Sequence, residues 1–346
     1  MGIRRFLAGT LAVTAWLVAI SACETSGTPA TSGTPTSSGG PNPSSTTTRA
    51  PRAVPFFGLD VPRADSLELQ RVASVIGCQP SVVSSFVKLD SAFSVHNLRA
   101  LNSHGATPFV TLEPWSQTLR SGQVDEPAYR LASITGGNHD AALVRIARAI
   151  AAYGKPVYLR FAHEMNGDWY PWATRVNAGS SSTYVAAWQH AHDVMARAGA
   201  HNAKWVWSPA ALATGPDGPA GGLSAMYPGD HYVDFVGFTG YGLTESAATT
   251  FDPWLAHVAA FTSRPVILSE IGADGPNKVA WISSLGPYLE QHPQIAGFVW
   301  FNTTPSSTGA SGYYRIDNSS AQVTAFRAVL ARLLIPCSSP PKVTPS

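Results

Sequence analysis

Two glutamates, Glu164 and Glu270, each come at the end of an apolar run that has the length of a buried strand. A carboxylate in such a place costs free energy unless it is paired or takes part in chemistry. A retaining glycosidase needs two carboxyl groups about 5–5.5 Å apart, one as acid/base and the other as nucleophile. Buried ion pairs, with Arg160 and Arg315 as partners, are the structural alternative.

Polar and aromatic side chains surround the first of these glutamates, in the segment RFAHEMNGDWYPW that runs from Arg160 to Trp172. Apolar neighbours such as Trp169 and Trp172 would raise the pKa of an acid here, and hydrogen bonds from Arg or Tyr would lower the pKa of a nucleophile. Arg160 has the same strand parity as Glu164, so both are expected to face the same interior unless a bulge intervenes. The ten Trp of the chain also suit a sugar ligand, although most Trp in proteins are core residues.

Other enzyme classes find little support in the sequence. HEMN at 163–166 is not the zinc motif H-E-x-x-H, because Gly167 stands where the second His is needed. Ser208 and Ser269 lack the G-x-S-x-G context of a serine hydrolase. We therefore expect no metal and no cofactor. A net charge of +2 leaves no basic surplus for a nucleic-acid partner.

Eight predicted strands alternate with longer helical runs from residue 55 onward. The strands are expected at 56–61, 82–89, 107–115, 156–164, 204–210, 233–241, 265–273 and 296–302. The helical runs, in which apolar residues recur at three and four, include 66–76, 139–153, 181–198, 277–291 and 319–334. This alternation predicts a (β/α)8 barrel, with an open doubly wound sheet as the runner-up. LDVPRADS, which follows the first strand, lacks the glycines of the phosphate loop that such a sheet usually carries.

A barrel places its chemistry at the carboxyl ends of its strands, and this sequence fits that demand. Polar and aromatic residues recur at six strand ends, LEPW, AHEMN, WSPA, GFTGY, SEIGA and VWFN. On this ground Glu113, Trp115 and Trp207 join the candidates for substrate contact. Glu113 could equally close a structural salt bridge, and Trp207 could equally belong to the core.

The first 52 residues indicate export and a tether. Residues 1–22 have the charged start, apolar run and small-residue end of a lipoprotein signal peptide, and Cys23 follows as the lipidated residue of the bacterial lipobox does. An ordinary signal peptide cut near Ala22 is the alternative. Residues 23–52 are rich in Ser, Thr, Pro and Gly and are predicted to form a disordered linker. We expect an exported protein that is lipid-anchored at the bacterial cell surface, or else secreted.

The folded part is predicted at 53–338, and a disordered tail at 339–346. Cys78 follows the first predicted helix and Cys337 follows the last, and in a closed barrel those two helices are neighbours. In an exported protein such a pair suggests one disulfide. Two buried free thiols are the alternative.

Three longer motifs together resemble glycoside hydrolase family 26, whose best-known members are β-mannanases. RFAHEMNGDWYPW (160–172) resembles the acid/base segment, PVILSEIGA (265–273) the nucleophile strand, and YPGDHYVDFVGFTGY (227–241) the stretch that leads to the sixth strand. KWVWSPA (204–210) is similar to the fifth strand. The resemblance runs with gaps from about Phe57 to the end of the barrel. It implies a barrel with catalytic glutamates on strands four and seven.

Residue by residue, the resemblance implies roles in catalysis. Glu164 would be the acid/base, and Glu270 the nucleophile that forms a glycosyl-enzyme intermediate. His163 would contact the substrate near the point of cleavage, and Tyr241 would hydrogen-bond the nucleophile. The residues that support these groups would be Arg160 and Asn166.

The same resemblance implies three sugar contacts from tryptophans. Trp169 and Trp172 would be platforms, and Trp300 would floor the subsite next to the scissile bond. The family often carries an acidic residue within the strand-six motif, where this chain has Thr239 and Gly240. This departure leaves the choice of substrate open.

The resulting expectation is a retaining, endo-acting hydrolase of β-linked polysaccharide. Mannan or glucomannan with β-1,4 linkages is the first choice, because it is the family's commonest substrate. A β-1,3/1,4-glucanase or a β-1,3-xylanase on the same scaffold is the alternative. A catalytically silent carbohydrate-binding surface protein is a further alternative, against which the presence of both glutamates counts. A structural envelope protein would leave the aromatic strand ends unexplained. We expect a monomer that meets a membrane only through its lipid anchor.

Overall fold

The computed structural model describes residues 54–62, 66–103, 105–116, 124–211, 222–242, 246–305 and 312–337. These residues all belong to one unit of the chain, Ala50–Ser346. The predicted signal peptide, Cys23, the predicted linker and the predicted tail at 339–346 lie outside the described residues. Within the described ranges, every helix is too short or too polar to cross a bilayer.

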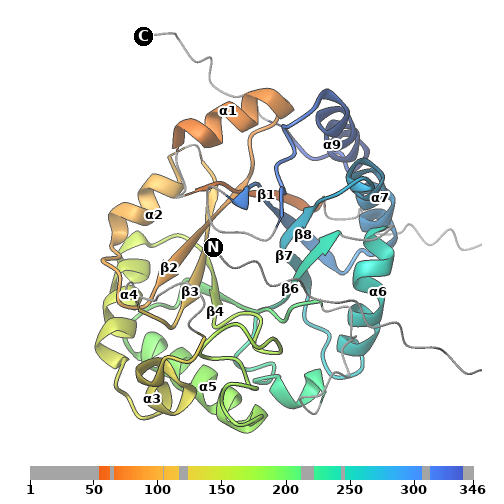
Figure 1. The fold of residues 1–346 in the computed structure, drawn as a ribbon. Coiled ribbons are helices and arrows are strands. Elements are labelled where there is room, and N and C mark those ends of the chain that lie inside the picture. The colour runs from red at the N-terminus through yellow and green to blue at the C-terminus, as the bar shows by residue number, and fades with distance from the viewer. Residues whose placement is uncertain are drawn as a thin grey trace, which may run out of the picture. The chain divides into compact units, whose positions relative to one another are not determined.

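Eight parallel strands close into a barrel in chain order, from β1 round to β8 and back to β1 (Figure 1). The strands are β1 (Phe56–Asp60), β2 (Val82–Lys88), β3 (Thr107–Glu113), β4 (Val157–Phe161), β5 (Ala203–Trp207), β6 (Phe235–Gly242), β7 (Val266–Ala273) and β8 (Ile295–Phe301). The predicted (β/α)8 fold is confirmed. A cluster of buried apolar side chains from β2, β3, β5, β7 and β8 fills the barrel interior: Val82, Phe109, Val206, Ile267 and Val299.

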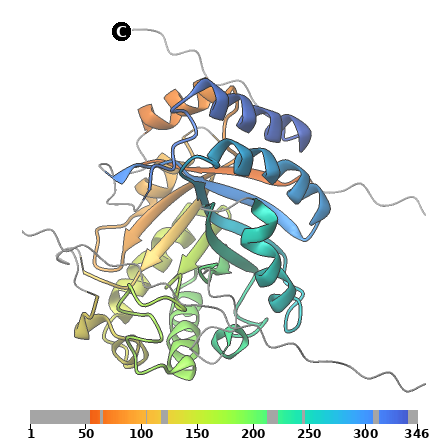
Figure 2. The same cartoon turned by 45° about the vertical axis from the view of Figure 1, so that its right-hand side comes forward.

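Helices surround the barrel on its outer side (Figures 1 and 2). They are α1 (Ser66–Ile76), α2 (Val95–Leu101), α3 (Leu131–Thr135), α4 (Asp140–Tyr153), α5 (Ser181–Arg197), α6 (Ala247–Val258), α7 (Lys278–Gln291) and α9 (Ser320–Arg332), with single turns η2 (Pro127–Tyr129) and η3 (Leu223–Met226). Ser180, Ser246 and Ser319 cap α5, α6 and α9, because each side chain accepts a backbone N–H three residues further on. Helices α2, α3 and α6 are additional to the predicted runs.

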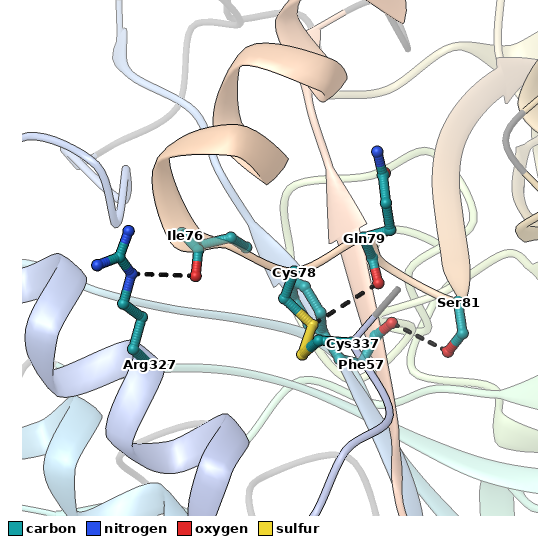
Figure 3. Close-up of a disulfide and its surroundings, with 7 residues drawn as sticks. All are labelled: Phe57, Ile76, Cys78, Gln79, Ser81, Arg327 and Cys337. Atoms are coloured by element: carbon teal, nitrogen blue, oxygen red, sulfur yellow. Dashed lines mark hydrogen bonds between the residues drawn. A yellow bond between two sulfur atoms is a disulfide. The ribbon is translucent and has the colours of Figure 1, made fainter. Parts of the chain in front are cut away.

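One disulfide joins Cys78, just after α1, to Cys337, after α9 (Figure 3). The two Cα atoms are 4.6 Å apart although 259 positions separate the residues in sequence. Arg327 of α9 adds a second tie, since its Nε donates to the carbonyl of Ile76 at 3.1 Å. The first and last helices are thus fastened side by side, as the predicted pairing requires.

Candidate active site

The strand that carries the first glutamate, β4, ends at Phe161, before its predicted end. Beyond it the backbone turns through Ala162 and Glu164, whose φ angles are 44° and 55°. Residues other than glycine rarely adopt this left-handed conformation, and such strain clusters at functional sites. The N–H of Glu164 donates to the carbonyl of Ser208 at 2.7 Å, which holds the turn against the end of β5. Arg160 and Glu164 do face the same interior, as expected, since both lie at Glu270. Glu164 reaches it from this turn and not through strand parity, because regular strand geometry has ended at Phe161.

Glu270 lies within β7 and is 6% exposed. Arg160 Nη2 donates to its Oε2 at 2.5 Å, and Tyr241 Oη donates to its Oε1. Both oxygens are held by donors, one of them cationic, which stabilises the negative charge of the carboxylate. Arg160 also donates to Thr111 Oγ1 at 2.9 Å and to Thr239 Oγ1 at 3.3 Å, so its guanidinium is fixed inside the barrel.

Glu164 lies close to Glu270. One oxygen of each carboxyl group, together with a ring nitrogen of His163, forms a set whose members lie within 4.8 Å of one another. Trp169 Nε1 donates to Glu164 Oε2 at 2.6 Å. Burial, followed by the charge of Glu270, raises the pKa of Glu164 to about 7. One carboxyl group can therefore hold a proton near neutral pH, whereas the charge of the other is stabilised by its two donors.

His163 is buried beside this pair, against the rings of Phe86, Tyr170 and Trp172. Neither of its ring nitrogens has a hydrogen-bond partner among the described residues. Burial, followed by the charge of Arg160, lowers the pKa of His163 well below the usual value, so the imidazole is neutral. A neutral ring with a free donor and a free acceptor next to two carboxyl groups is suited to hydrogen-bond a substrate there.

Two further buried carboxyl groups stand at strand ends. Glu113, at the end of β3, accepts from Trp115 Nε1 at 3.2 Å, and burial raises its pKa to about 7. Asp60, at the end of β1, is missing from the predicted site. Burial, followed by the charge of Glu270, raises the pKa of Asp60 well above its usual value. Its signal in the sequence is the acidic residue that closes FFGLD, the first predicted strand.

Aromatic side chains form one wall of the site. Trp169 is 39% exposed and presents a surface on which a sugar ring can stack. Trp115 is half-buried and meets Tyr170 edge-on, with ring centroids 5.4 Å apart. Trp172, expected as a second platform, is fully buried, so that expectation is wrong: its ring stacks on Tyr170 at 4.2 Å, and its Nε1 donates to the carbonyl of His163 at 2.6 Å. Trp172 therefore packs behind the aromatic wall and does not line the site. Tyr170, which is not among the predicted residues, covers its ring.

Trp207 and Trp300 lie on the outer side of the barrel, and their expected contact with substrate is wrong. Both are fully buried, Trp207 against aromatic rings outside the barrel and Trp300 against rings of α7 and α9. Successive side chains of a strand point to opposite faces, and Val206 and Val299 take the inward positions. Phe301, the residue after Trp300, faces the site instead.

Asn166 joins the turn after β4 to the segment after β5. Its Nδ2 donates to the carbonyl of Ala210 at 2.8 Å, and its Oδ1 accepts the N–H of the same residue at 2.8 Å. Ala210 in turn forms a bridge with Thr239 of β6. Asn166 therefore ties three neighbouring strand ends together from a supporting position.

His163, Glu164 and Glu270 are close enough to be considered as a metal site. Their surroundings argue against that use. The guanidinium of Arg160 lies 2.5 Å from Glu270 Oε2, so a cation there would stand beside a fixed positive charge. The indole N–H of Trp169 already occupies one oxygen of Glu164. The arrangement suits acid–base and nucleophilic chemistry by the carboxyl groups themselves.

Comparison with known proteins agrees with this chemistry. The model of glycosyl hydrolase family 26 matches residues 97–282, more than half of the chain. Endoglucanase H of Acetivibrio thermocellus is 30% identical over 273 residues, which are 73% of this chain and 28% of that protein. A mannan endo-1,4-beta-mannosidase of Bacillus subtilis (strain 168) is 25% identical over 231 residues, which are 61% of this chain and 60% of that protein. The chain thus spans less than two thirds of the length of these curated relatives.

Solved structures share the fold. A β-mannanase from Bacteroides ovatus superposes with a TM-score of 0.65 at 20% sequence identity, over 83% of this chain and 91% of that one. At this identity the likeness establishes the barrel alone. The range matched by the family model, 97–282, includes both Glu164 and Glu270.

Proposed function

This chain belongs to glycosyl hydrolase family 26, and from that premise we propose that it is a retaining, endo-acting hydrolase of β-linked polysaccharide. The observation that carries the proposal is the spacing of two buried carboxyl groups: an oxygen of Glu164 lies within 4.8 Å of an oxygen of Glu270. A retaining enzyme needs about 5–5.5 Å between these groups, whereas an inverting enzyme needs about 6.5–9.5 Å to admit a water. The spacing supports a double displacement.

In the first displacement, Glu270 attacks the anomeric carbon and forms a glycosyl ester. The bond from that carbon to the leaving oxygen breaks, and Glu164 gives its proton to that oxygen. In the second displacement, Glu164 takes a proton from a water whose oxygen attacks the same carbon and releases Glu270. The anomeric configuration inverts twice and is therefore retained.

The electrostatics of the pair support this exchange of roles by Glu164. The charge of Glu270 is the second largest cause of the raised pKa of Glu164, after burial. Formation of the ester removes that charge, so the pKa of Glu164 should fall once the first displacement is complete. The group that donated a proton then becomes a base for the second displacement.

Mannan or glucomannan with β-1,4 linkages is our first choice of substrate, because a mannan endo-1,4-beta-mannosidase is among the curated relatives. A β-glucanase is the second candidate, favoured by 30% identity to Endoglucanase H over 73% of this chain. Mannose and glucose differ in the direction of the 2-hydroxyl group. Stacking on Trp169 suits both sugars, so discrimination must come from the polar groups around the cleaved bond.

The proposal is tested by incubating the protein with mannan, glucomannan, mixed-linkage β-glucan, β-1,3-xylan and xylan, and by following new reducing ends. Wild type should cleave one polymer, and NMR of the earliest product should show the β-anomer. Silence on every polymer, together with binding to one of them, would instead support a carbohydrate-binding protein. An α-anomer as first product would contradict the double displacement.

We also infer, from residues 1–23, that the protein is exported and lipid-anchored through Cys23. Labelled palmitate fed to cells that express the full chain should enter wild type and should not enter Cys23→Ala. The variant should then leave the membrane fraction. Equal labelling of both chains would contradict lipidation at this position.

A further inference from the structure

The segment at residues 312–317, which follows β8 and is called the turn below, brings a second tyrosine to the proposed nucleophile. The ring of Tyr314 stacks on that of Tyr241, with centroids 4.4 Å apart and planes 23° from parallel. The hydroxyl of Tyr241 donates to Glu270. The stacked ring of Tyr314 therefore fixes the position of the Tyr241 ring that carries this hydroxyl. Gly272 of β7 makes the approach possible, because a Cβ at that position would lie 3.0 Å from the Tyr314 side chain.

The backbone around Tyr314 is held at several points. Its N–H donates to the carbonyl of Thr303 at 3.0 Å, and its carbonyl accepts from Trp300 Nε1 at 2.8 Å. Two residues further on, the N–H of Ile316 donates to Asn302 Oδ1 at 2.8 Å. Tyr314 lies outside the strands of the barrel. These hydrogen bonds therefore pair the backbone groups that a neighbouring strand would otherwise pair.

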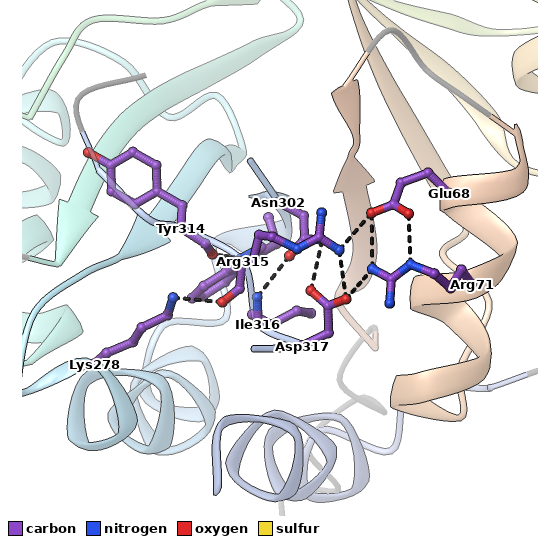
Figure 4. A network of polar contacts seen from close by, with 9 residues as sticks. Glu68, Arg71, Lys278, Asn302, Tyr314, Arg315, Ile316 and Asp317 are labelled. Atoms are coloured by element: carbon purple, nitrogen blue, oxygen red, sulfur yellow. Dashed lines mark hydrogen bonds and ion pairs between the residues drawn. The ribbon is translucent and has the colours of Figure 1, made fainter. Parts of the chain in front are cut away.

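Lys278 holds the same turn from α7. It is the first residue of the helix and is 4% exposed. Its Nζ donates to the carbonyls of Tyr313 and Arg315, at 2.6 Å each, and these two carbonyls flank Tyr314. Figure 4 shows the contact with Arg315. Burial lowers the pKa of Lys278 to about 8, so its charge is costly where it stands. A buried ammonium group is thus committed to two backbone carbonyls on either side of one aromatic residue.

The outer side of the turn is fastened independently. Arg315 Nη2 lies 2.6 Å from Glu68 Oε1 and 2.7 Å from Asp317 Oδ2, and Arg71 of α1 pairs with both carboxylates. Figure 4 shows that Tyr314 points away from this ion network while Lys278 reaches the backbone between them. Loss of Lys278 should therefore free the part of the turn next to Tyr314 without releasing the whole segment.

We infer that Lys278 is a positioning residue for the proposed nucleophile: it sets the turn so that Tyr314 holds the hydroxyl of Tyr241 on Glu270. The inference rests on the proposed function, in which Glu270 forms the covalent bond. It assigns Lys278 a role in the rate of that bond's formation, in addition to any role in folding.

The test measures formation of the covalent bond directly. A 2-deoxy-2-fluoro disaccharide with a dinitrophenolate leaving group, built from the sugar that the polymer assay identifies, should label wild type once per chain. Mass spectrometry gives the labelled fraction, and release of dinitrophenolate gives the first-order rate constant. For Lys278→Met we expect complete labelling with a rate constant about 10- to 100-fold lower, as for a small misplacement of a reacting group. A purely structural role would lower the labelled fraction and leave the rate constant unchanged, which would overturn the inference.

A double-mutant cycle asks whether Lys278 acts through Tyr241. Tyr241→Phe keeps the stacked ring and removes the donor. In that background Lys278→Met should slow labelling by less than about 2-fold, because both changes remove one and the same interaction. Independent, multiplicative losses would contradict the relay.

Matched variants separate the possible failures. Tyr314→Ala leaves Lys278 in place and should slow labelling as Lys278→Met does, so it carries the test if Lys278→Met does not fold. Leu143→Ala, in the buried face of α4, should lower stability without changing the rate constant. A wild type that is neither labelled nor active on any polymer would contradict the proposed function. If wild type is labelled and both Lys278→Met and Tyr314→Ala are labelled with the same rate constant, the result would contradict this inference but not the proposed function.

Discussion

The division of labour between Glu164 and Glu270 comes from what each side chain contacts. Glu270 accepts from a guanidinium and a phenol, so its charge is stabilised in place. Glu164 accepts from an indole N–H and lies near the charge of Glu270, and burial raises its pKa to about 7. Two side chains of the same chemistry are therefore suited to opposite tasks by their surroundings.

Replacement of Glu270 by Ala should lower turnover by at least about 10³-fold, because the covalent step is lost. Sugar binding should be largely kept. The turnover number on the cleaved polymer and calorimetric binding of an oligosaccharide check the two halves of this expectation. Glu290→Ala, on the outer helix α7, is the matched control and should keep full activity. Normal cleavage by Glu270→Ala would show that the assignment is wrong.

Replacement of Glu164 by Ala should spare aryl glycosides relative to polysaccharides, since a good leaving group needs little protonation. The measurement is kcat/KM on a dinitrophenyl glycoside and on the polymer, each compared with wild type. Equal losses on the two substrates would count against the acid role.

Glu113 should make stability depend on pH. Its pKa is raised to about 7 in the folded state, so the folded protein binds the proton more tightly than the unfolded chain does. The resulting stabilisation is complete below the usual pKa of a glutamate and is lost as pH rises through about 7. The titration of Glu113 should contribute at most about 3 kcal/mol to the fall in the free energy of unfolding as pH rises, and Glu113→Gln removes this contribution.

Urea unfolding at pH 5 and pH 8 measures this effect. The difference in free energy of unfolding between the two pH values should be smaller for Glu113→Gln than for wild type. Glu290→Gln, an equivalent change on the outer surface of α7, should leave the difference as it is in wild type. An unchanged difference in Glu113→Gln would refute the expectation.

At the scale of elements, the site depends on how the ends of neighbouring strands are joined. β4 stops at Phe161, and the acid stands on a left-handed turn that is held by Ser208 and Asn166. The turn after β8 is held from α7 by Lys278. In both places a polar side chain or a backbone group holds a segment that lies outside the hydrogen-bonded strands of the barrel. The position of a proposed catalytic group depends on that segment.

Asn166→Ala removes both bonds to Ala210 and should loosen the turn that carries Glu164. We expect a loss of about 1–3 kcal/mol in stability, because a buried donor and acceptor lose their partner. We also expect kcat on the polymer to fall by about 10-fold as the acid moves. Chemical denaturation and kinetics measure the two effects. A stability loss without any change in kcat would show that the turn does not position the acid.

At the scale of the whole described unit, closure of the barrel is secured far from the site. The disulfide between Cys78 and Cys337 follows α1, on the side where β2 begins, whereas the proposed chemistry lies where strands end. A bridge that spans 259 positions restricts the unfolded chain more than it shapes the site.

The double change Cys78→Ser with Cys337→Ser should therefore lower stability by roughly 3–5 kcal/mol and leave kcat at 25 °C as in wild type. Thermal unfolding and steady-state kinetics on the same preparations check both statements. Wild type under oxidising conditions is the reference. A fall in kcat well below the melting temperature would show that the bridge also shapes the site.

The sequence by itself determined the order of the elements, the barrel and the strand ends where polar groups gather. Those features follow from local hydrophobic period and from the rule that parallel strands in a barrel expose their carboxyl ends together. Glu164 and Glu270 could be found in this way, and so could the pairing of Cys78 with Cys337.

Tertiary structure decided which side of a strand each aromatic residue occupies. Strands of a closed barrel are buried on both faces, so no polar alternation tells Trp300 from Phe301. It also decided the left-handed turn at Glu164, from which this side chain reaches the interior beyond the end of β4. The hold of Lys278 on the carbonyls beside Tyr314 joins residues 35 and 37 positions apart. Backbone carbonyls carry no sequence signal, so only the folded chain reveals that contact.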